Sequence, residues 1–276
     1  MKHKKNVTIL LIAVALLALA AWWLAFRLEP SMLYHPTALA GATPGEFGLP
    51  YETLRISTAD GERLEAWYCP RPEQEGPVLL FFHGNAGNRE DRLHNVAGLW
   101  RAGISVLIFD YRGYGGSTGS PSEAGLLADG LAAFDWLEAR VRPRGIVLFG
   151  RSLGGAVAAR VALQRPARAL ILESTFTSVP EMARRVLPLP GLHLLARSRF
   201  DALGAVRELA HPLLVIHGNR DELVPFEMGK RIYEASASVN KQFRPVEGGR
   251  HNDTYYLAGA AYYEWLRSFL ASLDAP

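Results

Sequence analysis

A serine flanked by two glycines is the residue in this chain best placed for chemistry. Gly150-Arg151-Ser152-Leu153-Gly154 follows an apolar run at 147–149 and precedes a run of helix-forming residues at 156–159. This strand–turn–helix setting is typical of a nucleophile elbow, in which the serine is pushed out on a sharp turn. Small flanking residues let the strand and the helix come close together, and the new helix directs backbone N–H groups at the oxyanion that the serine creates.

A serine hydroxyl needs a general base, which is usually a histidine held by a carboxylate. Asp221 stands in the loop after the apolar run at 213–216, and His251 stands in the loop after the strand expected at 242–246. Ser152, Asp221 and His251 therefore occur in the chain order that an elbow-type enzyme requires. Each follows the carboxyl end of an expected strand, where open α/β sheets build their sites. We predict these three residues as the catalytic set.

Some neighbouring residues compete for these roles. Glu222 is an alternative acid next to Asp221, whereas Asp201 fits better as the N-cap of a helix. His83 precedes a glycine-rich loop that must supply the second oxyanion donor, and we expect it to orient that loop. The expected donors are the backbone N–H groups of Asn85 and Leu153.

The bulk composition excludes several classes of function. The chain has 276 residues and a formal net charge of +3, which equals the charge of Lys2, Lys4 and Lys5 at the N-terminus. The remainder is neutral overall, so bulk charge gives no case for nucleic-acid binding. Cys69 is the single cysteine, which excludes an intrachain disulfide and argues against a zinc–thiolate site. Nothing in the sequence calls for a metal or an organic cofactor.

The N-terminus is typical of a membrane anchor. After the cationic tail, residues 7–26 carry no charge and form a run long enough to span about 30 Å, the thickness of a bilayer core. Trp22 and Trp23 lie near the far end, as an interfacial aromatic belt requires. The lysines should remain cytoplasmic, which predicts a single-pass protein whose catalytic domain is exported to the periplasmic or lumenal side.

A cleaved signal peptide is the alternative for the same segment. Ala18-Leu19-Ala20 resembles a signal-peptidase site. The apolar run continues beyond that site through Trp22, Trp23 and Phe26, which favours retention. Either outcome places the catalytic domain outside the cytoplasm.

Three parts follow from this organisation. Residues 1–27 form the tail and anchor, 28–50 a linker rich in Pro, Gly, Ala and Thr, and 51–276 the catalytic domain. Within this domain strands alternate with helices, which predicts an α/β fold with a mostly parallel sheet flanked by helices. The alternation breaks at about 174–200, where prolines and short amphipathic pieces predict a small helical lid.

The combined motifs resemble the α/β-hydrolase superfamily. The motifs are His83-Gly84-Asn85-Ala86-Gly87-Asn88, Asp110-Tyr111-Arg112-Gly113-Tyr114-Gly115, the elbow at Ser152, and the loops at Asp221 and His251. Within the superfamily they resemble the membrane-anchored serine-hydrolase branch that includes human protein depalmitoylases and many bacterial members. The resemblance implies the α/β-hydrolase fold, Ser152 as nucleophile, Asp221 as acid, His251 as base, and an oxyanion hole at Asn85 and Leu153. It also implies that the Asp110 loop is structural.

The expected function is a membrane-anchored serine hydrolase that cleaves carboxylic esters or thioesters through an acyl-enzyme on Ser152. The expected substrate is a small or lipid-like acyl ester, and the oligomeric state is left open. Two alternatives share the fold: an aminopeptidase-like enzyme, which needs a carboxylate such as Glu173 or Glu181 for the substrate amine, and a non-catalytic binding protein.

Overall fold

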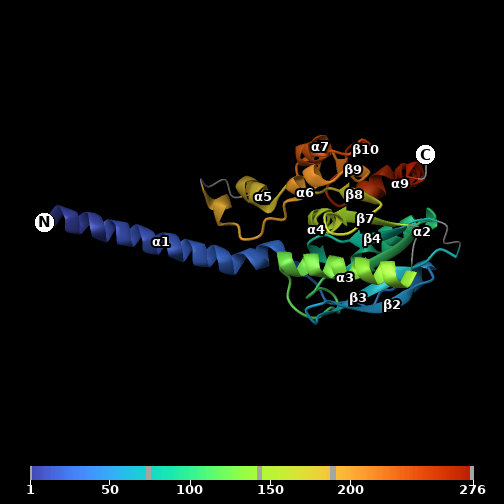
Figure 1. The fold of residues 1–276 in the computed structure, drawn as a ribbon, viewed down its shortest axis with the longest axis horizontal. Coiled ribbons are helices and arrows are strands. Elements are labelled where there is room, and N and C mark those ends of the chain that lie inside the picture. Colours follow the sequence, from blue (N-terminus) through green and yellow to red (C-terminus); the bar gives the residue numbers. More distant parts are fainter. Residues whose placement is uncertain (1, 73–75, 142–144, 187–190, 274–276) are drawn as a thin grey trace.

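The protein is built on a central eight-stranded sheet (Figure 1). The computed structural model describes residues 2–72, 76–141, 145–186 and 191–273. The strand order is β10-β9-β8-β7-β4-β6-β3-β2. The strands of this sheet are β2 (Glu52–Ser57), β3 (Arg63–Cys69), β4 (Val78–Phe82), β6 (Ser105–Phe109), β7 (Ile146–Arg151), β8 (Ala169–Glu173), β9 (Leu213–Gly218) and β10 (Lys241–Val246).

The pairing confirms the prediction of a mostly parallel sheet. Strands β4 and β6 to β10 pair in parallel, whereas β2 and β3 form an antiparallel hairpin whose β3 is also antiparallel to β6. Every residue of β4, β6, β7, β8 and β9 is buried. A strand covered on both faces reads as a continuous apolar run, which is why the sequence pattern located these strands.

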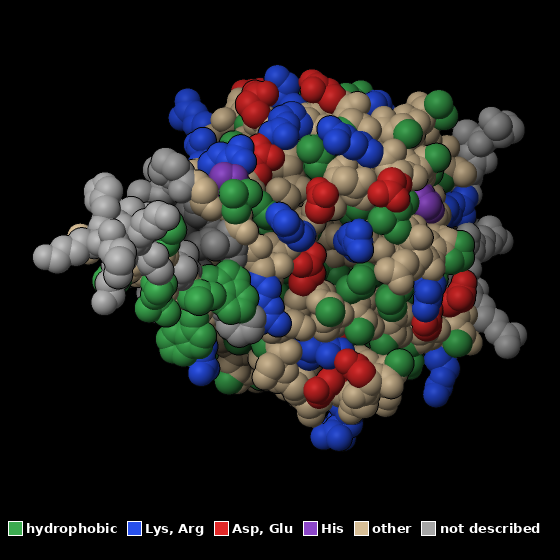
Figure 2. Space-filling model, turned by 60° about the vertical axis from the view of Figure 1, so that its left-hand side comes forward, with side chains coloured by type: hydrophobic (Ala, Val, Ile, Leu, Met, Phe, Trp, Pro, Cys, Tyr) green, Lys and Arg blue, Asp and Glu red, His purple; other side chains and the backbone are tan. Residues whose placement is uncertain are grey.

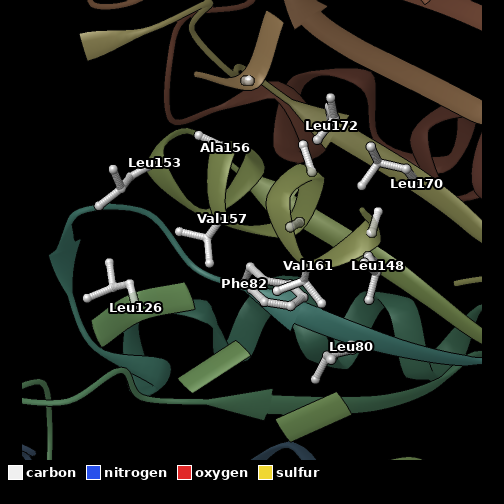
Figure 3. Close-up of a cluster of buried hydrophobic side chains, with 14 of the residues drawn as sticks. Leu80, Phe82, Leu126, Leu148, Leu153, Ala156, Val157, Val161, Leu170 and Leu172 are labelled. Atoms are coloured by element: carbon white, nitrogen blue, oxygen red, sulfur yellow. The ribbon is translucent and has the colours of Figure 1, made fainter. Parts of the chain in front are cut away.

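The helices cover both faces of the sheet and generate two hydrophobic clusters. Helices α3, α4, α6 and α7 contribute to one cluster, and α2 and α9 contribute to the other. Figure 3 shows part of the first cluster, where α4 packs over β4 and β7 and faces α3. The helices are α1 (Lys2–Leu33), α2 (Leu93–Arg101), α3 (Glu123–Val141), α4 (Leu153–Ala162), α5 (Val179–Val186), α6 (Ala202–Glu208), α7 (Phe226–Ala235), α8 (Thr254–Ala258) and α9 (Ala260–Ser272), with 3₁₀ turns η1 (Pro44–Phe47), η2 (Arg89–Arg92) and η3 (Leu192–Leu195).

The C-terminal helical segment is divided in two. Gly259 has φ 54° and ψ −128°, and it separates α8 from α9. A helix cannot continue through a residue with that backbone conformation, and glycine adopts it without a Cβ clash. The break lets α8 begin directly after the loop that carries His251.

The N-terminal helix α1 projects away from the sheet domain (Figure 1). Among the described residues, no helix is both long enough and apolar enough to cross a membrane. Many side chains of residues 7–26 lie outside the described part of the chain. The membrane-spanning segment therefore stays a prediction.

The region expected to form a lid contains short helical pieces, as far as it is described. Helix α5 spans Val179–Val186 and η3 spans Leu192–Leu195, and residues 187–190 between them lie outside the described residues. Phe200, at the end of this region, has φ 40°. Its ring is buried and packs edge-to-face on Tyr34, with ring centroids 6.4 Å apart.

The loop that begins at Asp110 is held by a buried ion pair. The Asp110 carboxylate accepts the backbone N–H of Arg89 at 2.7 Å and also binds the Arg89 guanidinium. The same guanidinium contacts Glu65 at 3.0 Å and lies 4.5 Å from the centre of the Trp67 ring. Burial raises the pKa of Asp110 to about 6 although Arg89 opposes that shift. These contacts join β3, β6 and η2 beneath the loop at 83–88.

Replacing Asp110 by asparagine should destabilise the fold strongly. Asp110→Asn leaves the buried Arg89 charge with only the partly exposed Glu65 as a partner, and breaking a buried pair costs up to about 3–5 kcal/mol of unfolding free energy. Urea denaturation followed by tryptophan fluorescence measures the loss. Glu264→Gln is the control, because Glu264 forms an exposed ion pair with Arg267 on α9 and should leave the midpoint unchanged. Equal midpoints for the two variants would contradict a structural role for the Asp110 pair.

Candidate active site

The turn between β7 and α4 places Ser152 in a strained conformation. Its φ of 53° and ψ of −119° lie in a region that residues other than glycine rarely adopt. A Cβ on Gly150 would lie 2.5 Å from the carbonyl oxygen of Gly154, and one on Gly154 would lie 2.1 Å from that of Phe82. Both clashes involve backbone, so only glycine permits this turn.

The structure brings Ser152, Asp221 and His251 into one hydrogen-bonded chain. Ser152 Oγ lies 3.1 Å from His251 Nε2, and His251 Nδ1 lies 2.8 Å from Asp221 Oδ2. The three residues follow β7, β9 and β10, at the same edge of the sheet. Ser152 and His251 are only 9% and 6% exposed, so the chain of hydrogen bonds is largely shielded from solvent.

Asp221 is held as a carboxylate. Its Oδ1 accepts the backbone N–H groups of Leu223 at 2.9 Å and Val224 at 2.7 Å. Burial would raise the pKa of Asp221, but the contacts from His217 and His251 hold it well below its usual range. The carboxylate is therefore ionised at neutral pH and fixes the proton of His251 on Nδ1.

A second histidine, His217, also contacts the Asp221 carboxylate. His217 Nε2 lies 3.3 Å from Asp221 Oδ2 and donates to the carbonyl of Val224 at 3.0 Å. This backbone hydrogen bond is the role that its place at the end of a strand indicates. Glu222, the alternative acid, lies nearer the backbone of His251, whose N–H is 3.4 Å from its Oε2. The imidazole of His251 therefore contacts Asp221 and not Glu222.

The loop at 83–88 lies against the elbow. A Cβ on Gly84 would be 3.6 Å from the Cβ of Ser152, so this loop borders the serine directly. Within the described part of the chain, the amide nitrogens of Asn85 and Leu153 donate no hydrogen bond. The carbonyl of Asn85 accepts the Tyr114 hydroxyl at 2.8 Å and the N–H of His35 at 2.9 Å, which fixes the orientation of the peptide that follows the Asn85 N–H. Among the described residues, two unpaired amides thus belong to segments next to Ser152.

His83 is a neutral part of the scaffold. It is fully buried, and its Nδ1 donates to the carbonyl of Gly84 at 2.8 Å. Burial lowers the pKa of His83 to about 3, so the ring carries no charge at neutral pH. The ring packs against that of Tyr111 in a tilted arrangement, with centroids 4.5 Å apart. These contacts orient the loop at 83–88 in the way that the sequence indicated.

The segment after α1 clamps the same loop. Strand β1 (His35–Pro36) pairs in parallel with β5 (Ala86–Gly87) to form a separate two-stranded sheet. The side chain of Asn85 donates to the carbonyl of Leu33 at 3.1 Å, and that of Asn88 donates to Thr37 Oγ1 at 3.0 Å. We call residues 33–41 the brace. The far end of the brace is held by Glu90, whose carboxylate accepts the N–H groups of Ala40 and Gly41.

The local sequence pattern does not predict the brace as an element of structure. It lies within the segment expected to be a linker, and its strand is too short for an alternating pattern. Its partners are about 50 residues away in the chain. The apolar and aromatic character of residues 32–36 is consistent with packing of this segment on the domain.

A buried ion pair supports the backbone of His251. Arg151 Nη2 donates to the carbonyl of His251 at 2.9 Å, and Arg151 Nε lies 3.4 Å from Glu173 Oε1. Glu173 is completely buried and also accepts the hydroxyls of Tyr262, at 2.7 Å, and Thr254. Charged residues at the ends of two otherwise apolar strands were the available signal, but sequence analysis did not connect them.

This combination of sheet, elbow and hydrogen-bonded serine defines a class of α/β protein. A model of the α/β hydrolase fold matches residues 77–202. The chain is 39% identical to the alpha/beta hydrolase domain-containing protein WAV2 of Arabidopsis thaliana, over 83% of this chain and 81% of that protein. The chain therefore belongs to the α/β-hydrolase family.

Two further comparisons extend this result. The chain is 37% identical to the lysophosphatidylserine lipase ABHD12 of Danio rerio, over 68% of this chain and 57% of that protein. It is similar in fold to the esterase Pf2001 of Pyrococcus furiosus, with a TM-score of 0.75 at 21% identity over 87% of this chain and 98% of that structure.

Removal of the Glu173 charge should lower the rate of ester hydrolysis, because it should displace His251. Glu173→Gln keeps the side-chain volume but weakens the hold of Arg151 on the His251 loop. A small misplacement of a catalytic group can cost about 100-fold, so we expect kcat for a short p-nitrophenyl ester to fall by about 10- to 100-fold with KM little changed. Steady-state kinetics with a parallel melting curve measures both effects.

Glu181→Gln is the matched control for this experiment. Glu181 also pairs with an arginine, Arg231, but it does so on α5 away from His251. The control should keep the wild-type kcat. An unchanged kcat in Glu173→Gln would show that Arg151 positions His251 without its carboxylate partner.

Proposed function

We propose that this protein is a serine hydrolase that cleaves carboxylic esters or thioesters through an acyl-enzyme on Ser152. The observation that carries the proposal is the continuous chain of hydrogen bonds from Ser152 through His251 to an ionised Asp221. An ionised carboxylate behind a histidine is what the attack of a serine hydroxyl at neutral pH requires.

The geometry supports a two-step reaction. His251 Nε2 takes the proton of Ser152 as Oγ attacks the acyl carbon, and Asp221 stabilises the resulting imidazolium. The amides of Asn85 and Leu153 receive the negative charge on the carbonyl oxygen, and a donor of this kind is worth about 3–4 kcal/mol. His251 then protonates the departing alcohol or thiol. In the second step His251 activates a water, which releases the acid and restores Ser152.

A lipid-like substrate is supported by the relatives and by the position of the site. One relative is named for the hydrolysis of a lysophospholipid, and a structural neighbour is an esterase. The loop at 83–88 carries the proposed donor Asn85, and we call it the oxyanion loop. The brace joins this loop directly to the end of α1, so the site lies next to the segment that we propose as the tether.

We further propose that α1 tethers the enzyme to a membrane, with the lysines cytoplasmic and the catalytic domain on the exported side. Residues 7–26 carry no charge, and described side chains such as Ile9, Leu16 and Trp22 are at least half exposed on α1. Figure 2 shows hydrophobic side chains gathered at the side from which α1 projects, whereas basic and acidic side chains intermingle over the rest of that face.

The peptidase alternative has less support. It needs a carboxylate in the pocket to bind the substrate amine. Glu173 is buried behind the site with Arg151, Thr254 and Tyr262, and Glu181 binds Arg231 and Thr177. We therefore expect turnover of acyl esters and acyl thioesters, and none of aminoacyl amides, in a panel of chromogenic substrates. Preferential cleavage of the amides would replace the proposal by the peptidase alternative.

A fluorophosphonate probe tests the nucleophile itself. Full-length protein in detergent should become labelled, because the probe phosphonylates an activated serine. Ser152→Ala should abolish labelling, whereas Ser120→Ala, at an exposed loop serine, should keep the wild-type signal. In-gel fluorescence gives the readout. Failure of the wild type to label would refute the proposed function and favour a binding protein on the same fold.

A further inference from the structure

A cavity of about 420 Å³ lies between the end of α1, the start of α3, α4 and the end of the lid region. Its size falls within the range of small-molecule sites, about 300–1,000 Å³. Ser152 does not line it. The cavity therefore needs an explanation of its own, which depends on what surrounds it and on how far it lies from the oxyanion loop.

Two residues that line the cavity are close in the chain to the two proposed oxyanion donors or to a residue that contacts one of them. Val157 lines the cavity four residues after Leu153 in α4, which is a distance of about 6 Å along a helix. Tyr34 lines it from the brace, directly after Leu33, whose carbonyl accepts the Asn85 side chain at 3.1 Å. Figure 3 shows Leu153 and Val157 on the side of α4 that faces Leu126 of α3.

Part of the cavity lining consists of buried apolar side chains. Tyr34, Val157 and Phe200 are buried members of the hydrophobic cluster on this face of the sheet, and Leu127 packs against them. An interior of this kind favours a hydrocarbon chain over a polar ligand.

The two carboxylates of the lining are turned away from a ligand. Glu29 of α1 accepts the backbone N–H groups of Arg197 at 2.6 Å and Ser198 at 2.7 Å. Glu123 of α3 accepts those of Arg199 at 2.7 Å and Phe200 at 2.6 Å. These hydrogen bonds hold residues 197–200 over the cavity. Arg160 and Arg197 also line it, so the charged part of the lining contains both signs.

We propose that this cavity is the subsite for the acyl chain of the substrate. With the scissile carbonyl between Asn85 and Leu153, the chain runs along α4 past Val157 and lies between Leu127, Tyr34 and Phe200. Glu29 and Pro30 of α1 form one wall, so a chain that leaves a lipid layer along α1 reaches the cavity first. This inference rests on the proposed function, because it assigns a specificity element to the same Ser152 chemistry.

Filling the cavity tests the proposal through chain-length selectivity. Leu127→Trp places a large side chain at a partly exposed position of the lining. The ratio of kcat/KM for p-nitrophenyl octanoate to that for p-nitrophenyl acetate should fall by about tenfold or more, as expected when apolar contacts in a pocket are lost. The measurement uses the full chain in detergent, with a melting curve for each variant.

Leu131→Trp is the matched control, since Leu131 lies one turn further along α3, is also partly exposed and does not line the cavity. It should keep the wild-type ratio. Leu127→Ala is a second probe for the case in which the tryptophan variant does not fold, and it should shift the preference from octanoate towards laurate. An unchanged ratio and an unchanged preference, with fluorophosphonate labelling intact, would overturn the acyl subsite and leave the proposed function standing. Absence of labelling in the wild type would overturn both.

Discussion

The close approach of α4 to the end of β4 is the constraint on which the site depends. The backbone at Gly154 lies so near the carbonyls of Phe82 and His83 that no side chain fits between them. Because of this contact, the peptide of Leu153 starts a helix beside the loop at 83–88, and the amides of Leu153 and Asn85 share one side of Ser152. The strained turn at Ser152 follows from the same packing, and the buried strands on either side maintain it.

The proximity of Ser152, Asp221 and His251 could be predicted from the sequence because each of them has a local marker. Ser152 is framed by glycines, and Asp221 and His251 each follow a strand that the apolar pattern located. Parallel strands bring their carboxyl ends to one edge, so chain order and strand position were enough to predict that these side chains are neighbours. The mostly parallel sheet itself followed from the alternation of strands with helices.

The supports of the site could not be predicted in the same way. Glu173, Arg151 and the brace act through single hydrogen bonds between residues far apart in the chain, and such contacts leave no periodic pattern. Gly259 shows the same limit within a helix, because a glycine inside an apolar pattern does not reveal whether its φ is positive. Periodicity reports which face of an element is buried, but it does not report which distant polar group completes a polar network.

Because of the brace, the position of a proteolytic cut near the end of α1 determines whether the loop at 83–88 keeps its contacts. A cut after Ala20, or anywhere before Leu33, would leave a chain that still contains β1 and its contacts with Asn85 and Asn88. A cut only a few residues later would detach β1 and leave the loop at 83–88 with no partner for its own short strand β5. A shortened form of this protein would therefore keep the braced conformation of this loop only if the cut lies before the brace.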